Sequence, residues 1–250
     1  CGTPSLAAAG GWSDSGPVVH TTTSSDNVGI GTSTASYNLT FSNNAAKSIG
    51  ISRSTGTSVG RNLTLKAGDA ASGGTDLTGG NIVIEAGIST GSKTGDIILR
   101  TSKTSGTSGS SDNTVSDRFW IHGGRTINDG TITPLFDVTN VISTQSGGGM
   151  VLWSIVNTDG TEVQSTSGMT FYSIVSKAGT ITTDIQMLPT SSKITTAGST
   201  IVPTWSITSS GSTVTINVTV ASSLTASSGH PRINFMVFNN DYHDLSMRDQ

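Results

Sequence analysis

Residues Asn62–Gly68 read NLTLKAG, and related segments follow at Asn81–Gly87 (NIVIEAG) and Asp96–Ser102 (DIILRTS). Each segment opens with Asn or Asp, carries two apolar residues two positions apart, and continues with a charged residue. Alternation with a period of two is typical of a β-strand, and the stretches rich in Gly, Ser and Thr between the segments predict turns. The chain therefore contains an imperfect repeat of short strands, with a weaker copy at Ser48–Arg53.

The repeat offers too few apolar side chains to build a core within one chain. Burying one Leu or Ile contributes about 1.5–3 kcal/mol, whereas ordering the backbone of each residue costs about 1–2 kcal/mol. A solenoid needs rungs of equal length, but the first apolar residues of the three segments stand at positions 63, 82 and 97. Identical chains side by side supply the missing contacts without regular rungs. We therefore predict that residues 46–105 form an intertwined homotrimeric shaft, like a triple-stranded β-helix, with a trimer core of Leu63, Leu65, Ile82, Ile84, Ile97 and Leu99.

The sequence changes in character near Pro134, where aromatic and long apolar residues become denser. Residues 213–220 alternate cleanly between Val or Ile and Thr or Asn, as a half-buried strand does. Further strands are expected at Leu135–Val138, Met150–Val156, Met169–Val175, Thr180–Met187, Thr204–Thr208 and Arg232–Phe238. We predict an all-β protein with an N-terminal β connector (1–45), the trimeric shaft (46–133) and a C-terminal β-sandwich or jelly-roll head (134–250).

Scarcity of charge excludes several functional classes. Charged residues make up 12% of the 250 residues, against a usual share of about 25%, and the net charge is −3. Without a basic stripe the chain is not expected to bind nucleic acid, and without an apolar run of roughly 18 residues it is not expected to insert into a membrane. Cys1 has no second cysteine with which to form an internal disulfide, and we favour a segment boundary there over the lipid-bearing first residue of a lipoprotein.

Isolated acidic and histidine side chains are the candidates for catalysis and for metal binding. Glycan hydrolysis needs two carboxylates across the scissile bond, and the candidates are Asp69, Asp76, Glu85 and Asp96. We interpret all four as solvated shaft charges, so that no catalytic residue is assigned. The densest set of potential metal ligands is Asp241-Tyr242-His243-Asp244 with His230, and we interpret it as a polar tail. His20 and His122 are interpreted as polar strand residues, and we expect no metal and no cofactor.

Aromatic residues in the head are the candidates for ligand binding. Most of them should fill the core, because a head of about a hundred residues needs aromatic volume. One or two exposed rings could stack on a sugar. The candidate binding residues are Tyr242, Trp205 and Tyr172.

Several segments resemble bacteriophage tail-fibre and tailspike proteins. Asp26–Thr32 (DNVGIGT) is similar to an Asn-Val-Gly-Ile-Gly-Thr segment common in trimeric phage fibres, and Trp12–Gly16 resembles the lead-in to it. Asp117–Ile121 resembles a strand that recurs in their shafts, residues 61–102 resemble Gly-rich shafts, and residues 203–235 resemble small β heads. The resemblance implies a virion-associated, trimeric, non-enzymatic fibre. No helical segment follows residue 134, so a self-cleaving chaperone is not expected.

Three functional hypotheses follow. The first is a structural fibre or spike segment of a virion, extracellular, that joins a tail or a longer fibre chain and attaches to a glycan or protein on the host surface. The second is a cellular surface adhesin or extracellular filament subunit, and the third is a polysaccharide-degrading tailspike. We favour the first, because three weak sites on one stalk gain avidity without strong single contacts.

Overall fold

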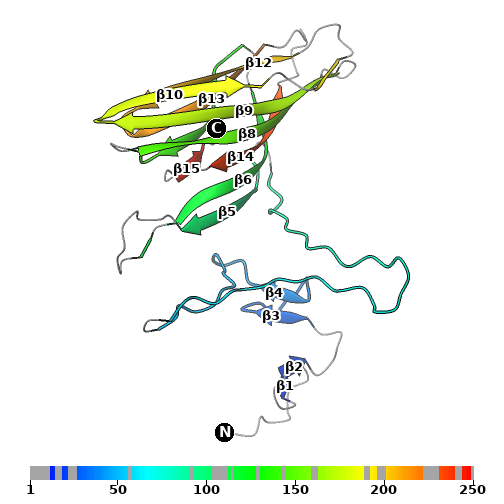
Figure 1. The fold of residues 1–250 in the computed structure, drawn as a ribbon. Coiled ribbons are helices and arrows are strands. Elements are labelled where there is room, and N and C mark those ends of the chain that lie inside the picture. The colour runs from blue at the N-terminus through cyan, green and yellow to red at the C-terminus, as the bar shows by residue number, and fades with distance from the viewer. Residues whose placement is uncertain are drawn as a thin grey trace. The chain divides into compact units, whose positions relative to one another are not determined.

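The computed structural model describes residues 12–14, 19–21, 27–55, 58–90, 93–102, 112–113, 115–127, 130–141, 145–158, 163–188, 192–195, 201–221, 231–239 and 244–248. Every regular element within these ranges is a β-strand, which confirms the all-β expectation (Figure 1). The same ranges hold no helix long and apolar enough to cross a membrane. The chain divides into two compact units, Cys1–Ile82 and Val83–Gln250, which are described separately.

Among the residues of the first unit that the structure describes, there are four strands of three residues each. Strands β1 (Trp12–Asp14) and β2 (Val19–Thr21) pair antiparallel, and β3 (Val28–Ile30) and β4 (Leu39–Phe41) pair parallel. Strand β3 lies in the segment that resembles phage fibres, and the chain turns directly after it. An added Cβ at Gly29 would come within 2.7 Å of the Thr32 carbonyl oxygen, and Gly31 has a φ of +73°, so that both positions favour glycine.

The repeat segments do not form strands in the single chain. The expected strands at Asn62–Gly68 and Asn81–Gly87 are extended backbone without a ladder, seen as a bare cyan trace in Figure 1. The Gly80 amide donates to the Gly68 carbonyl at 2.9 Å, so that the chain folds back at this point without pairing further. In the single chain these two segments form no ladder, and the trimeric arrangement in which the strands are expected stays a prediction. A strand with two apolar residues needs a neighbouring strand and an apolar cover, and the chain provides neither here.

The second unit is built on two antiparallel sheets. The larger has seven strands in the order β10-β9-β8-β14-β6-β5, with β11 also paired to β9, and the smaller has the order β12-β13-β7-β15. The strands of the larger sheet are β5 (Asp96–Ser102), β6 (Val115–Thr126), β8 (Gln145–Thr158), β9 (Val163–Lys177), β10 (Thr180–Met187), β11 (Ser192–Thr195) and β14 (Arg232–Asn239). The strands of the smaller sheet are β7 (Thr133–Thr139), β12 (Val202–Ser210), β13 (Thr213–Ala221) and β15 (Asp244–Met247).

The third repeat segment belongs to the head sheet and not to a separate shaft. The sequence analysis placed residues 46–133 in the shaft, but Asp96–Ser102 is β5 and pairs with β6. Strand β14 lies between β6 and β8, so that Val237 pairs with Trp120 on one side and with Val151 on the other. The head sheet therefore begins at Asp96, well before the expected boundary at residue 134. The place of β14 beside β6 is hidden in the sequence, because the two strands lie more than a hundred residues apart along the chain.

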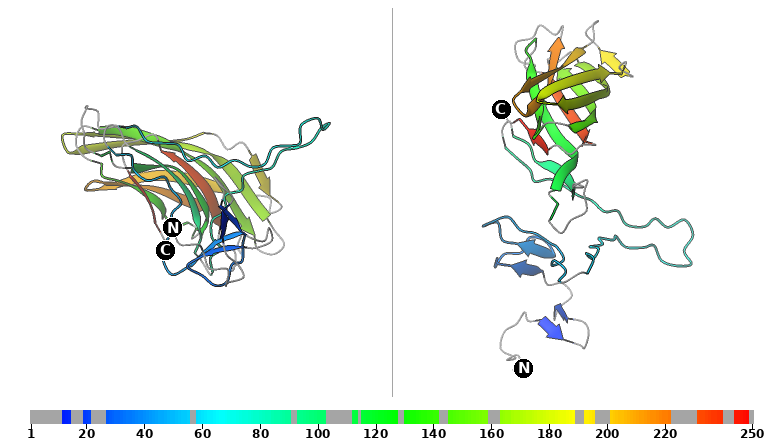
Figure 2. Two further views of the ribbon diagram at one scale, coloured as in Figure 1. Left: turned by 90° about the horizontal axis from the view of Figure 1, so that it is seen from below. Right: turned by 60° about the vertical axis from the view of Figure 1, so that its left-hand side comes forward.

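The two sheets form two layers (Figures 1 and 2), and the buried apolar side chains of both make up one core. Phe136 of β7 is fully buried, with its ring 5.9 Å from that of Tyr172 and 6.3 Å from that of Phe235. Trp153 of β8 meets Trp205 of β12 at a ring distance of 5.9 Å. Aromatic contacts across the layers thus join the sheets at two places.

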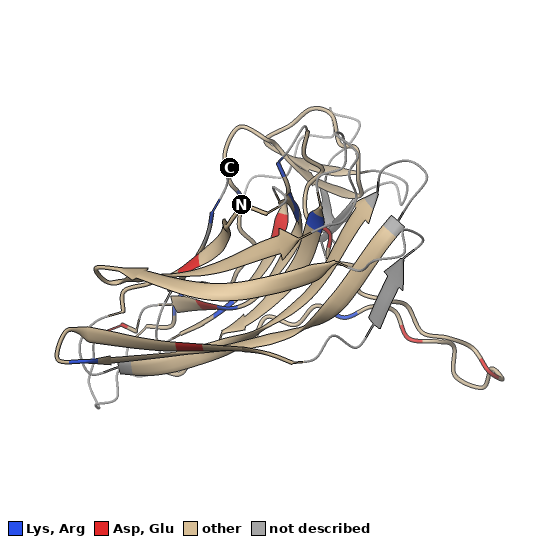
Figure 3. Ribbon diagram, turned by 90° about the horizontal axis from the view of Figure 1, so that it is seen from above, with Lys and Arg blue, Asp and Glu red and all other residues tan. Residues whose placement is uncertain are grey.

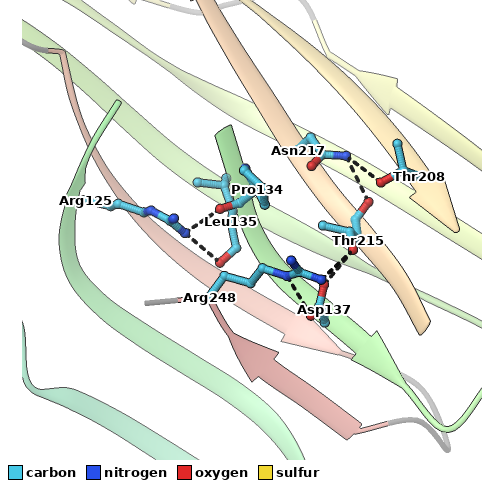
Figure 4. A network of polar contacts seen from close by, with 8 residues as sticks. All are labelled: Arg125, Pro134, Leu135, Asp137, Thr208, Thr215, Asn217 and Arg248. Carbon is cyan, nitrogen blue, oxygen red and sulfur yellow. Dashed lines mark hydrogen bonds and ion pairs between the residues drawn. The ribbon is translucent and has the colours of Figure 1, made fainter. Parts of the chain in front are cut away.

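Two arginines link polar groups around the smaller sheet (Figure 4). Arg125 of β6 donates to the Pro134 carbonyl on β7, which ties the larger sheet to the smaller. Arg248 Nε lies 2.7 Å from Asp137 Oδ2, and the Thr215 hydroxyl donates to Asp137 Oδ1 at 2.6 Å. The Asp137 carboxylate therefore has partners from two other segments and fixes the register of β7 between β13 and β15.

The core predicts a large effect of truncating Phe136. Phe136→Ala should lower the free energy of unfolding by about 3–5 kcal/mol, because it leaves a cavity among Tyr172 and Phe235. Urea unfolding followed by tryptophan fluorescence measures this, since Trp120, Trp153 and Trp205 all lie in the second unit. The control Ile132→Ala, at an exposed position, should change the value by less than about 0.5 kcal/mol. Equal effects of the two variants would contradict the described core.

Candidate interaction surface

Five of the six predicted trimer-core residues, Leu99 among them, are more than half exposed in the single chain, and Ile97 is partly buried in β5. Leu63, Leu65, Ile82 and Ile84 are between 51% and 67% exposed. Neighbouring apolar residues share this exposure: Ile49, Ile51, Val59, Leu77, Val83 and Ile88. Scattered exposed apolar residues are normal on a monomer, but a succession of them along one segment marks an interaction site. The repeat segments therefore present apolar surface that the chain itself does not cover.

The outer face of the larger sheet is a second apolar surface. Residues paired across an antiparallel register point to the same face of a sheet, and alternate residues along a strand point to opposite faces. Trp120, Val151 and Val237 point into the core, so their neighbours along each strand point outward. The first outward row is Ile97, Ile121, Met236, Leu152 and Met169, and the second is Leu99, Phe119, Phe238, Met150 and Phe171. We call these ten side chains the apolar rows.

The apolar rows cross five strands, from β5 to β9. Phe119 and Phe238 are in ring contact at 4.7 Å, while Phe171 is 41% exposed and Met236 is 39% exposed. A groove of about 520 Å³ lies over the first row, between Leu152, Met169, Met236 and Leu188. Its polar lining residues include Ser154, Ser167 and Asn234, which form the next row of the register. The face is thus apolar at its centre and polar along this border.

Charge is absent from the apolar rows themselves. Figure 3 marks the Lys, Arg, Asp and Glu residues along the ribbon. Among the described charged residues of the larger sheet, Arg100 of β5 pairs with Asp117 of β6, and Asp184 lies in β10, beyond the rows. A surface of this composition suits an apolar partner and not a charged one.

Two of the three candidate binding aromatics are core residues. Trp205 is 8% exposed and Tyr172 is 3% exposed, and the Tyr172 hydroxyl contacts Asn239 Oδ1 at 3.3 Å. Neither ring offers a face on which a sugar could stack, because the opposite sheet covers it. The structure does not support the sequence-based assignment of these two residues to binding. Tyr242 lies outside the described residues.

The candidate carboxylates have different surroundings. Asp69 pairs with Lys66 at 2.5 Å on the surface, and Asp76 occupies an exposed turn with a φ of +55°. Glu85 lies in the exposed repeat, whereas Asp96 is the first residue of β5. Asp69 and Asp76 belong to the first unit, and Glu85 and Asp96 belong to the second.

Asp96 and His122 are brought together by the pairing of β5 with β6. Trp120 Nε1 donates to Asp96 Oδ2 at 2.8 Å, and His122 Nδ1 lies 2.8 Å from Asp96 Oδ1. The His122 ring also packs on Phe235 at 5.0 Å. Both oxygens of the Asp96 carboxylate are therefore occupied by neighbours in the sheet, and the group holds β5 to β6.

Metal ligation is not offered by the part of the chain that the structure describes, which contains no group of three acidic, histidine or cysteine side chains. Of the set proposed from sequence, His230, Asp241 and His243 lie outside the described residues, as Tyr242 does. The side chains of His20 and Asp244 are likewise not described.

Sequence reasoning missed the apolar rows, although a signal for them was present. Met150–Val156 reads MVLWSIV and Ile233–Phe238 reads INFMVF, so that apolar residues fall on both faces of each strand. Such runs are typical of strands that are covered on both sides. The prediction of a sandwich accounts for only one apolar face of these two strands, and the second apolar face is what it leaves out.

Comparison with known proteins finds no family model and no curated protein that matches this chain. Among solved structures, the tailspike protein of Acinetobacter phage vB_ApiP_P1 is 18% identical over 52% of this chain and 22% of its own, with a TM-score of 0.28. The tailspike protein of Acinetobacter baumannii phage AM24 is 8% identical over 60% of this chain and 26% of its own, also with a TM-score of 0.28. The matched region therefore spans about a quarter of each tailspike chain.

The surroundings of Asp96 predict a structural role that can be measured. Asp96→Asn should lower the free energy of unfolding by about 1.5–3 kcal/mol, since the amide cannot accept from both Trp120 and His122. Urea unfolding followed by tryptophan fluorescence reports the change. Asp76→Asn removes the same charge from an exposed turn whose positive φ asparagine tolerates, and it should be neutral. If the Asp96→Asn variant were as stable as the wild type, the structural role of this carboxylate would be contradicted.

Proposed function

We propose that this chain is part of a trimeric phage tail fibre or tailspike that attaches a virion to a host cell surface. The observation that carries the proposal is the exposure of Leu63, Leu65, Ile82 and Ile84 along the repeat. The segments that resemble trimeric phage fibres, Asp26–Thr32 among them, support the same assignment.

Assembly from three copies supplies what the repeat lacks. Each apolar side chain that becomes buried contributes about 1.5–3 kcal/mol, and a threefold axis brings the same residue of every copy to one height. Ordered in this way, the extended segments of three chains form the shaft, and each shaft carries three heads. Three weak contacts with a repetitive cell-surface glycan then act together, which raises the avidity without strong single sites.

The proposed role is attachment and not hydrolysis. Several described carboxylates of the second unit are engaged within the fold: Asp96 by Trp120 and His122, Asp117 by Arg100, and Asp137 by Arg248. A hydrolytic pair needs two carboxylates facing one substrate across a fixed gap. Carboxylates that serve as anchors between strands favour a structural protein of the virion.

A binding experiment with an assembly-deficient variant tests the proposal. The full chain should have three times the 25.5 kDa chain mass by light scattering and should bind host cells when fluorescently labelled. The variant Leu63→Ser/Leu65→Ser/Ile82→Ser/Ile84→Ser should lose trimer mass and at least about 100-fold in apparent cell affinity, because avidity is lost. Purified capsule or lipopolysaccharide from the same cells should compete with the wild-type chain.

Ile132→Ser, which removes an exposed apolar side chain of the second unit outside the repeat, is the matched control and should bind as the wild type does. A monomeric chain, or equal binding by the repeat variant, would contradict the proposal. Release of reducing sugar from the polysaccharide would contradict the non-enzymatic part of it.

A further inference from the structure

We infer that the outer face of the larger sheet is a subunit interface, in which the apolar rows pack against a second copy of this chain. The inference rests on the proposed function, which brings copies together. It adds that contacts between heads hold the assembly, and not only contacts between the repeat segments.

The composition of the rows fits the centre of a protein interface. Such centres are enriched in aromatic residues and Met and depleted of charge. The rows contain three phenylalanines and three methionines and no polar side chain: Phe119, Phe171, Phe238, Met150, Met169 and Met236. A glycan needs hydrogen-bonding groups at the centre of its site, and here the backbone groups are engaged in the sheet. Copies with the same net charge also approach most easily where neither presents charge.

The size of the face fits a stable contact. Five strands about 4.8 Å apart and two rows about 7 Å apart cover on the order of 340 Å². The next rows on either side, with Asn234, Ser154 and Ser167 along one border and Gly148 and Ser173 along the other, extend the face to about 500 Å². A specific interface buries at least about 500 Å² on each partner, and a standard one buries about 800 Å². The groove over Leu152, Met169 and Met236 offers a recess for a side chain of the second copy.

The face is also continuous along the chain with the repeat. Ile97 and Leu99 begin the two rows, and both come from the third repeat segment. The second repeat segment ends beside them, because a Cβ at Gly95 would lie 2.6 Å from the Gly87 carbonyl oxygen. The apolar surface proposed to join the copies in the shaft therefore leads directly into the rows.

The test compares a face variant with a matched control in the full chain. Phe171→Glu/Met236→Glu places two charges on the rows, whereas Val202→Glu changes a residue of the smaller sheet that is 50% exposed. Sedimentation velocity measures the concentration at half-assembly, and near-ultraviolet circular dichroism of the buried tryptophans checks the fold. The face variant should raise that concentration at least about 30-fold, and the control should leave it within about twofold.

Hydroxyl-radical labelling of the wild-type chain gives a second measurement that needs no variant. On assembly, labelling of Met236 and Phe171 should fall at least about fivefold, as expected for residues at an interface centre. Labelling of Val202 should stay constant. If the face variant loses the near-ultraviolet circular dichroism of its tryptophans, it is misfolded. The labelling of the wild-type chain then tests the interface by itself.

Three results would overturn the inference. A trimer whose Met236 and Phe171 remain fully labelled refutes the interface and leaves the proposed function intact. Protection of the same residues in the monomer shows that another segment of the same chain covers the face. A chain that stays monomeric at every concentration overturns both the interface and the trimeric fibre.

Discussion

The repeat segments carry apolar side chains that their own chain does not bury. This constraint governs the rest of the molecule, because exposed Leu and Ile along an extended backbone contribute nothing to the stability of a monomer. Leu63, Leu65, Ile82 and Ile84 remain more than half exposed, and the segments that hold them form no ladder. In the proposed trimer, identical copies bury these side chains by bringing the same residue of each chain to one height.

The head buries its own apolar side chains on one face of the larger sheet only. Between its sheets, Phe136, Tyr172 and Phe235 pack in the interior, Arg125 joins the two layers, and Asp137 joins strands of the smaller sheet. On its outer face the apolar rows are uncovered, so the head resembles the repeat in this respect. The third repeat segment is itself β5, a strand of the head.

Local patterns in the sequence predicted where strands lie better than which strands pair with one another. The alternation at 213–220 gave β13, and the expected strands Met150–Val156 and Met169–Val175 lie within β8 and β9. The repeat pattern did not reveal that Asp96–Ser102 pairs with β6, since alternation within a strand does not say which strand lies beside it. The strands expected at Asn62–Gly68 and Asn81–Gly87 failed in the single chain because period-two alternation specifies a strand only when a neighbour is present.

Candidate sites were harder to predict than strands. Trp205 and Tyr172 were chosen because aromatic rings suit sugars, but residue type does not say which face of a strand a ring occupies. Asp96 was considered as an isolated charge, whereas the register places it between Trp120 and His122. The apolar rows needed the register of five strands before they became visible.

Hydrogen–deuterium exchange at residues 60–90, followed by mass spectrometry over a range of protein concentrations, tests the dependence of the repeat on other copies most directly. Amides of Leu63–Lys66 and Ile82–Glu85 should exchange within seconds in dilute protein and become protected, by at least about 100-fold, where the chain assembles. Protection that is already complete in the monomer, or exchange that stays fast in a trimer, would contradict the requirement for companion chains.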